Sequence, residues 1–351
     1  MMTRRHLLAG ALLVLAAGRL GPPARSVVPE SLTDEQFWTL SQELSEEGGT
    51  FRSSENLLSN ERLMQHVIPT LTRGVRPGSV YLGVGPEQNF TYIAALKPSI
   101  AFIVDIRRGN LQLHLMYKAL FELSADRAEF VSRLFSRARP PGLSTAATAT
   151  EIFNAIDAAP ANDLLFMDNA RAIRHHLTEV RKWPLPAADM QGIEWIHQSF
   201  YSNGPMIQYS ANFGRNGSFP TYAELMTATD ADGVYRSYLA SEEAFAYLKS
   251  LHSRNLILPV VGDFAGDRAL RAIGRYLKDK QAVVGAFYLS NVEQYLGRDG
   301  RWHLFCQNVA SLPLDDRSRF IRSIRDSSYG RGLGLNSVTG YMLSETRGCN
   351  P

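Results

Sequence analysis

The sequence predicts an α/β fold with a mostly parallel sheet, helices on both faces and a helical insertion. Three observations predict it. A strand, a glycine turn and a helix follow one another over residues 79–96. The unbroken apolar run over residues 100–106 is typical of a strand that is covered on both faces, as in a parallel sheet. Strand and helix patterns alternate again over residues 256–289, as they do in α/β proteins.

The composition is that of an ordinary globular protein. The chain has 351 residues, of which 45% are hydrophobic and 20% charged, and it is long enough to bury a substantial core. Its two cysteines, Cys306 and Cys349, are too few for a disulfide framework, and no Cys/His spacing of a metal site is present. We therefore expect no metal, and we expect neither cysteine to do chemistry.

The N-terminus predicts export. The pair Arg4-Arg5 precedes an apolar run over residues 7–18, which is too short for a bilayer span of roughly 20 residues. Small residues precede a predicted cleavage after Ser26, so residues 1–26 read as a signal peptide that resembles a twin-arginine signal. The mature protein would then be periplasmic or secreted, with no stable membrane anchor. The alternatives are an uncleaved anchor or a misassigned start codon, and without a functional leader the protein is cytoplasmic.

The net charge of +3 arises in this leader, which carries four arginines and no acidic residue. The 37 basic residues less these four leave 33 against 34 acidic residues, a net charge of −1. A near-neutral body gives no electrostatic reason to expect nucleic acid or an anionic membrane as a partner. We expect a small-molecule ligand, and the sequence does not determine the oligomeric state.

Helical spacing predicts two helices before the first strand. The first covers residues 32–45 with Thr33 or Asp34 as N-cap, and the second covers residues 60–71 with Asn60 as N-cap.

The predicted strand–turn–helix comes next. The strand over residues 79–82 leads through two glycines to Pro86, which suits a first helical position, and the helix ends before Pro98. Residues 110–136 predict a long helix with Ser124 as the candidate break.

Residues 139–254 are mostly helical and irregular. We interpret them as an insertion over one end of the sheet, because the α/β pattern resumes afterwards, and we predict a single domain over residues 27–330 and a flexible tail over residues 331–351. The clear helices of the insertion are 151–158, 194–201 and 242–253. The elements predicted after it are strands 256–261, 282–289 and 303–309 and helices 267–279 and 318–325.

The main constellation is Gly83 and Gly85 with Asp105 downstream. The glycines let the backbone approach a ligand closely, and the following helix presents free N–H groups. An acid at the end of the next strand can accept both hydroxyls of a ribose. The pattern predicts a nucleotide-type site in a Rossmann-like sheet. The alternative is a structural turn in which Asp105 caps a helix.

This unit resembles the first motif of class I S-adenosylmethionine-dependent methyltransferases. Gly83 and Gly85 match its first two glycines, and Asp105 matches its ribose-binding acid. Tyr81 stands in place of the initial acid and Glu87 in place of the third glycine. The resemblance implies S-adenosylmethionine as the cofactor, bound by these glycines, Glu87 and the acid.

The dinucleotide-binding pattern is also incomplete, because it requires a glycine where Gln88 stands. A negative charge at Glu87 disfavours the pyrophosphate of NAD more than it disfavours a sulfonium cation. Longer blocks resemble an uncharacterised family of bacterial proteins with a methyltransferase-like fold, which implies the fold more than a reaction. These blocks are 59–61, 81–92, 102–107, 116–135, 259–277 and 287–296.

Further candidates follow two later strands. Asp263 comes directly after a predicted strand, where the methyltransferase resemblance implies contact with adenine or substrate; the alternative is a helix cap, which suits Asp267 better. Ser290 with Glu293 has the spacing of a capping box. Glu293 and Tyr295 would nevertheless stand on the same edge, where a carboxylate and a phenol can orient a substrate or move a proton.

The histidines offer no site. His175-His176 lies in a charged helix and reads as a solvated face, and His114 reads as a satisfied core group. Two hypotheses follow. The first is S-adenosylmethionine-dependent methyl transfer to an unknown acceptor, and the alternative is a non-catalytic nucleoside-binding or envelope protein. Export favours the second, because S-adenosylmethionine is made in the cytoplasm.

Overall fold

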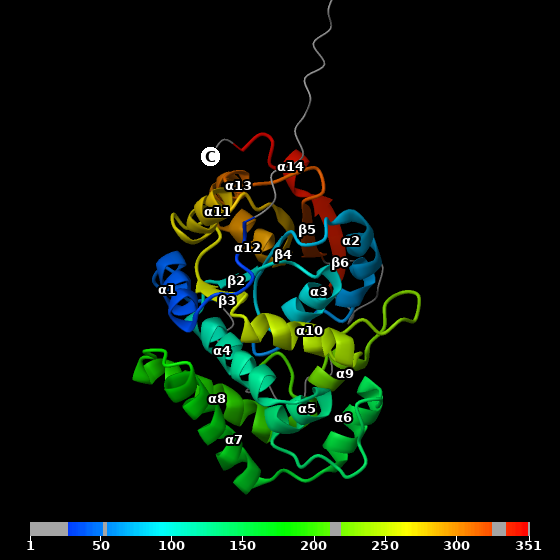
Figure 1. The fold of residues 1–351 in the computed structure, drawn as a ribbon. Coiled ribbons are helices and arrows are strands. Elements are labelled where there is room, and N and C mark those ends of the chain that lie inside the picture. The colour runs from blue at the N-terminus through cyan, green and yellow to red at the C-terminus, as the bar shows by residue number, and fades with distance from the viewer. Residues whose placement is uncertain (1–26, 52–54, 211–218, 325–334, 350–351) are drawn as a thin grey trace, which may run out of the picture.

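The computed structural model describes residues 27–51, 55–210, 219–324 and 335–349 (Figure 1). The predicted signal peptide lies outside these ranges. No helix within them is long and apolar enough to cross a bilayer.

A six-stranded sheet forms the centre of the molecule, and its strand order is β3-β2-β1-β4-β5-β6. All neighbouring pairs are parallel except β5 and β6, which are antiparallel. The predicted α/β fold with a mostly parallel sheet is therefore confirmed. The strands are β1 (Val80–Gly83), β2 (Ala101–Asp105), β3 (Ile257–Val261), β4 (Val284–Ser290), β5 (Arg319–Ile324) and β6 (Asn336–Tyr341).

The strands β1, β2 and β3 are buried along their whole length, which explains their unbroken apolar sequences. In Figure 1, α11 and α13 lie on one side of the strands and α3, α4 and α10 on the other. These helices are α3 (Gln88–Leu96), α4 (Arg108–Leu123), α10 (Glu242–Ser253), α11 (Ala269–Asp279) and α13 (Trp302–Ala310).

The first predicted helix is confirmed as α1 (Asp34–Leu44), capped by Thr33 in a reciprocal box with Gln36. The second begins later than predicted, as a short 3₁₀ helix η1 (Met64–Val67) that continues into α2 (Ile68–Gly74). Asn60 caps neither helix, because the N-cap of η1 is Leu63 and that of α2 is Val67. Residues 59–61 line a cavity.

Of two predictions for the helices on either side of β2, one is wrong and one is confirmed. Pro86 precedes the N-cap of α3, which is Glu87, so its predicted place at the first helical position is wrong. The break at Ser124 is confirmed, because α4 ends there and α5 (Arg127–Phe135) starts afresh with Asp126 as its N-cap.

Most of the insertion packs on the far side of α4 from the strands, in green in Figure 1. Its Tyr209 reaches the carboxyl edge of the sheet. Its helices before α10 are α6 (Ala149–Ala158), α7 (Asp163–His175), the π-helix η2 (His176–Val180), α8 (Ala187–Asn203), η3 (Gly204–Met206) and α9 (Tyr222–Thr227).

The C-terminal elements differ from the sequence-based predictions in three places. Residues 303–309 belong to helix α13 rather than a strand, and residues 319–324 form strand β5 rather than a helix. The tail over residues 331–351 is not flexible throughout, because β6 pairs along the whole of β5 and α14 (Met342–Glu345) follows it. Cys306 of α13 forms a disulfide with Cys349, which ties the C-terminal segment to the domain.

An ion network joins α4 to η2 and, through the pair between Arg181 at the end of η2 and Asp34 at 2.7 Å, to α1. The carboxylate of Glu122 lies 2.9 Å from the amine of Lys118 and 2.8 Å from the guanidinium of Arg181. His176 also contacts Glu122, so its prediction as part of a solvated face is wrong. Burial alone would raise the pKa of Glu122, but the His176 hydrogen bond and the charges of Lys118 and Arg181 outweigh burial and lower this pKa to about 2.

Candidate functional site

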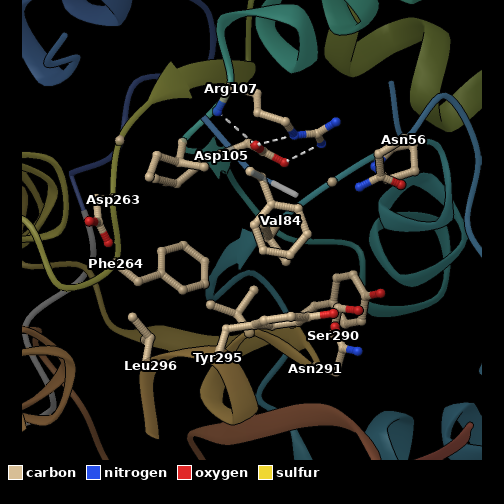
Figure 2. Close-up of a pocket in the computed structure, with 18 of the residues that line it drawn as sticks. Asn56, Val84, Asp105, Arg107, Asp263, Phe264, Ser290, Asn291, Tyr295 and Leu296 are labelled. Atoms are coloured by element: carbon tan, nitrogen blue, oxygen red, sulfur yellow. Dashed lines mark hydrogen bonds and ion pairs between the residues drawn. The ribbon is translucent and has the colours of Figure 1, made fainter. Parts of the chain in front are cut away.

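A cavity of about 250 Å³ opens at the carboxyl ends of β1, β2, β3 and β4 (Figure 2). The strand order changes direction between β1 and β4, which is where open α/β sheets bind ligands. The residues that line it include Phe51, Asn56, Ser59, Glu61, Val84, Gly85, Gln88, Asp105, Arg107, Tyr209, Asp263, Phe264, Tyr288, Ser290, Tyr295, Leu296, Asp299 and Arg301.

The glycine turn after β1 is held by Asn89. Its side-chain amide donates to the carbonyls of Val84, Gly85 and Pro86 at 2.9, 3.1 and 2.7 Å. The hydroxyl of Tyr81 donates to the Asn89 carbonyl oxygen at 2.9 Å. Tyr81 therefore fixes the turn through Asn89. The methyltransferase motif has an acid at the position of Tyr81, and the sequence analysis did not predict a role for Asn89.

The two glycines have different roles. A Cβ on Gly83 would lie 1.9 Å from the Asn89 carbonyl oxygen, and Gly83 does not line the cavity, so its small size serves the turn. Gly85 lines the cavity and has a φ of +76°, a conformation that favours glycine. Its carbonyl lies 2.8 Å from Nε2 of buried His114, whose pKa burial lowers to about 4. His114 is thus a core group, as predicted, but it is not fully satisfied, because its Nδ1 has no hydrogen-bond partner among the described residues.

Asp105 ends β2 and lies in the wall of the cavity, 4% exposed. Figure 2 shows Arg107 grasping its carboxylate: Nε lies 3.1 Å from Oδ1 and Nη2 lies 2.9 Å from Oδ2. The Arg107 backbone N–H also donates to Oδ1 at 2.9 Å. The predicted ribose-binding acid therefore already has a bidentate partner two residues along the chain. It does not cap α4 with a side-chain hydrogen bond.

Asp263 follows β3 and lines the cavity, as its position predicts. Its Oδ1 accepts from the Ala265 N–H at 2.9 Å, and its Oδ2 pairs with Arg301 at 2.6 Å. The prediction that Asp267 caps the next helix is wrong, because the N-cap of α11 is Arg268 and no side chain caps it.

The segment after β4 divides the remaining candidates. Tyr295, on α12 (Val292–Arg298), lines the cavity and packs edge-on against Phe51 with ring centroids 4.8 Å apart. Glu293 does not line the cavity and pairs with Arg322. The capping box is wrong, because Asn291 is the N-cap of α12 and no side chain caps it, whereas Ser290 donates elsewhere.

Glu61 is a cavity residue that the sequence analysis did not predict, and it is the most buried acid among the lining residues. It is 1% exposed, and three side chains donate to its carboxylate: Tyr288 at 2.7 Å, Ser290 at 2.6 Å and Gln88 at 2.8 Å. The only sign of Glu61 in the sequence is the resemblance block over residues 59–61, and residues 60 and 61 also fit the start of the predicted helix over residues 60–71.

Glu87 does not line the cavity, although the motif comparison placed it beside the ligand. It is completely buried, and the Ser59 N–H lies 3.3 Å from both carboxylate oxygens. Burial raises its pKa to about 8, and the nearby Glu61 adds to this shift. Glu87 is therefore largely protonated at neutral pH.

This raised pKa makes stability depend on pH. A carboxyl group whose pKa rises from 4.5 to about 8 on folding contributes its full stability below pH 4.5 and loses it as the pH rises through 8. We expect Glu87→Gln to remove this loss, so that the variant melts several degrees above the wild type at pH 9 but not at pH 5. Melting curves across this range test it, with exposed Glu47→Gln as the control. Parallel curves for Glu87→Gln and the wild type would contradict it.

No group of three His, Cys, Asp or Glu side chains suited to a metal ion occurs within the described ranges.

A family model described as a domain of unknown function (DUF7790) matches residues 57–346. The match spans every strand, Glu61 and the glycine turn, and it excludes α1, Phe51 and Asn56. A search of curated proteins found no match.

Proposed function

Since this chain belongs to the DUF7790 family, whose description leaves its function open, we propose a function from the cavity itself. The cavity binds a nucleoside-type ligand, and its reaction is S-adenosylmethionine-dependent methyl transfer to an unidentified acceptor. One observation carries the proposal: the ends of β1, β2 and β3 bring Gly85, Asp105 and Asp263 to one cavity beside the change in strand order.

The size of the cavity supports a single nucleoside over a dinucleotide. Its volume of about 250 Å³ lies just under the range of roughly 300–1,000 Å³ that is usual for small-molecule pockets. Apolar side chains form much of its wall, and Figure 2 shows Val84, Phe264 and Leu296 around the same space as Tyr295. Flat apolar walls with a few polar groups are suited to a purine ring and its ribose.

The polar groups fit such a ligand. Each oxygen of a carboxylate can accept two hydrogen bonds. The Arg107 backbone N–H and Nε take both places on Oδ1 and Nη2 takes one on Oδ2, so Oδ2 can accept from one ribose hydroxyl while Asp105 keeps its pair with Arg107. The turn at Gly85 has no Cβ and permits close approach of the ligand to the backbone. S-adenosylmethionine supplies an electrophilic methyl group when bound. The protein has to align the acceptor with it and to exclude water.

Asp263 and Tyr295 are the candidates for contact with the acceptor, because both line the cavity. Glu293 is not, because Arg322 holds its carboxylate outside the lining. Asp263 is itself held by Arg301, so its role is to orient the acceptor by hydrogen bonds.

The second candidate function is non-catalytic binding of a nucleoside-type ligand. The pair between Asp105 and Arg107 favours it, because both carboxylate oxygens already have a partner in the protein. The departures at Tyr81 and Glu87 favour it as well: the first holds Asn89 and the second is buried away from the cavity.

Asp105→Ala tests both forms of the proposal. We expect the wild type to show a thermal shift with S-adenosylmethionine and S-adenosylhomocysteine, and Asp105→Ala to lose affinity by at least tenfold, because it removes the acceptor for the ribose. The matched control is Asp189→Ala, which removes an equally buried acid with a bidentate partner, Arg108, outside the cavity. No response of the wild type to S-adenosylmethionine, S-adenosylhomocysteine, NAD or ATP would refute nucleoside binding. Turnover with methyl acceptors separates the two candidates.

We also propose that the mature protein is exported. The disulfide between Cys306 and Cys349 supports this, because such bonds persist mainly in oxidising compartments. A reporter fused to residues 1–30 is expected to be exported from the cytoplasm. The same fusion with Arg4 and Arg5 changed to Lys is expected to remain in the cytoplasm. Fractionation of the cells measures both. Unchanged export of the Lys variant would exclude the twin-arginine route, and retention of the unmodified fusion would exclude export.

A further inference from the structure

The acids of the cavity differ in their countercharges. Asp105 is paired with Arg107 and Asp263 with Arg301. Asp299 is exposed to solvent. Glu61 is 1% exposed, and within the described part of the chain no lysine, arginine or histidine forms an ion pair with it.

The partners of Glu61 are all neutral. Two hydroxyls, of Tyr288 and Ser290, donate to Oε1, and the amide of Gln88 donates to Oε2. These bonds fix the direction of the carboxylate, but they leave its charge without a counterion in a buried wall. Burial of a charge without an opposite charge nearby is costly, and a positively charged group of a ligand would supply the missing countercharge.

The backbone beside Glu61 is strained as well. Ser290 has a φ of +51°, which is unusual for a residue other than glycine, and the register of β4 with β5 shifts between Tyr288 and Ser290. This conformation accompanies the hydrogen bond from the Ser290 hydroxyl to Glu61. Strained residues that orient a buried polar group concentrate at binding sites.

We infer that Glu61 is the subsite for a positively charged group of the ligand, at the change in strand order between β1 and β4. Glu61, Ser290 and Gln88 all line the cavity that also holds Asp105 and Asp263. The inference rests on the proposed nucleoside site and specifies it: the ligand is a nucleoside that carries an ammonium or sulfonium group. The Glu61 carboxylate supplies the opposite charge, and its three donors hold it in place without neutralising it.

The test compares nucleosides that differ in charge. S-adenosylmethionine carries a sulfonium and an ammonium, S-adenosylhomocysteine carries the ammonium, and 5′-methylthioadenosine carries neither. Calorimetry on the mature protein is expected to give wild-type affinities at least tenfold higher for the first two. Glu61→Gln is expected to lose this preference and to bind 5′-methylthioadenosine within about threefold of the wild type, which also shows that the variant folds. Glu293→Gln is the control, because that carboxylate is paired with Arg322 outside the cavity.

Each outcome has one meaning. A preference for the charged nucleosides that Glu61→Gln abolishes and Glu293→Gln retains supports the subsite. Equal wild-type binding of 5′-methylthioadenosine and S-adenosylhomocysteine, or a preference that survives in Glu61→Gln, overturns the subsite but leaves the nucleoside site standing. Absence of binding by all three nucleosides to the wild type overturns the proposed function and the subsite with it. If Glu61→Gln unfolds, Glu61→Ala provides the second variant, because it removes the carboxylate without placing an amide N–H among its three donors. Loss of the preference in Glu61→Ala supports the subsite, and an unchanged preference overturns it.

Discussion

Replacement of Glu122 by alanine is expected to lower the free energy of unfolding by about 3–5 kcal/mol, the cost of removing one partner of a buried ion pair. The side chains of Glu122 and Lys118 are 4% and 2% exposed, so the variant would leave Lys118 as a buried charge without an acidic partner. Arg181 is less buried and would keep its pair with Asp34. Phe37 and Trp183 lie against the Lys118 amine, so water does not readily replace the lost carboxylate. Urea unfolding at pH 7 measures the loss.

The control for this prediction is Glu243→Ala, whose carboxylate pairs with Lys97 in solvent. Exposed pairs of this kind contribute little, so the control is expected to unfold at nearly the wild-type urea concentration. A Glu122→Ala variant as stable as the control would show that the network joining α4, η2 and α1 is dispensable. Simultaneous replacement of Glu122 and Lys118 by apolar residues is expected to recover part of the loss, because no buried charge of that pair then remains.

Removal of the disulfide is expected to have an effect of similar size. Cys306 and Cys349 are 43 residues apart, and the loop-closure model gives about 4 kcal/mol for a loop of this length. We expect the double variant Cys306→Ser/Cys349→Ser to unfold at a markedly lower denaturant concentration than the wild type. The double replacement avoids a lone thiol, which would add mispaired products.

A reducing agent provides the internal control for the disulfide. It is expected to lower the unfolding midpoint of the wild type to that of the double serine variant and to leave the variant unchanged. The loss of stability should be largest around β6, because Cys349 lies in the segment that follows this edge strand and the disulfide ties that segment to α13. The prediction would be contradicted if the reduced wild type kept its unfolding midpoint and the double variant were equally stable. The disulfide would then contribute nothing to stability.

The parts of the fold that the sequence predicted well are those where one local pattern has one reading. The apolar run of β2 between Pro98 and Arg107 is compatible with a buried strand, and Thr33 with Gln36 is compatible with a helix start. Residues 303–309 and 319–324 are short apolar-rich runs that fit either state. Tertiary structure decides between them: Phe305, Cys306, Asn308 and Val309 are buried with helical spacing, and β5 gains partners on both sides.

The site residues that could be predicted are those at or directly after the ends of adjacent strands. Asp105, Asp263 and Gly85 lie at the cavity for that reason. Partners across the site were not predictable: Glu61 meets Tyr288 and Ser290 across more than two hundred residues of sequence. The role of Tyr81 was hidden for the same kind of reason, because the meaning of a tyrosine at that position depends on where Asn89 turns its amide.

The pairing of β2 with β3 also determines when this site can form. The whole helical insertion lies between these two neighbouring strands in the sequence, and β1 obtains its second partner only when β4 has been made. Until then the edges of β1 and β2 have unpaired backbone groups that can pair with other chains. Contacts between such distant segments slow folding, because a long loop must close before they form. A ribosome-bound chain that ends before residue 290 therefore carries the glycine turn and Asp105 but has no complete ligand site, and folding of the sheet is the step at which aggregation competes with the native protein.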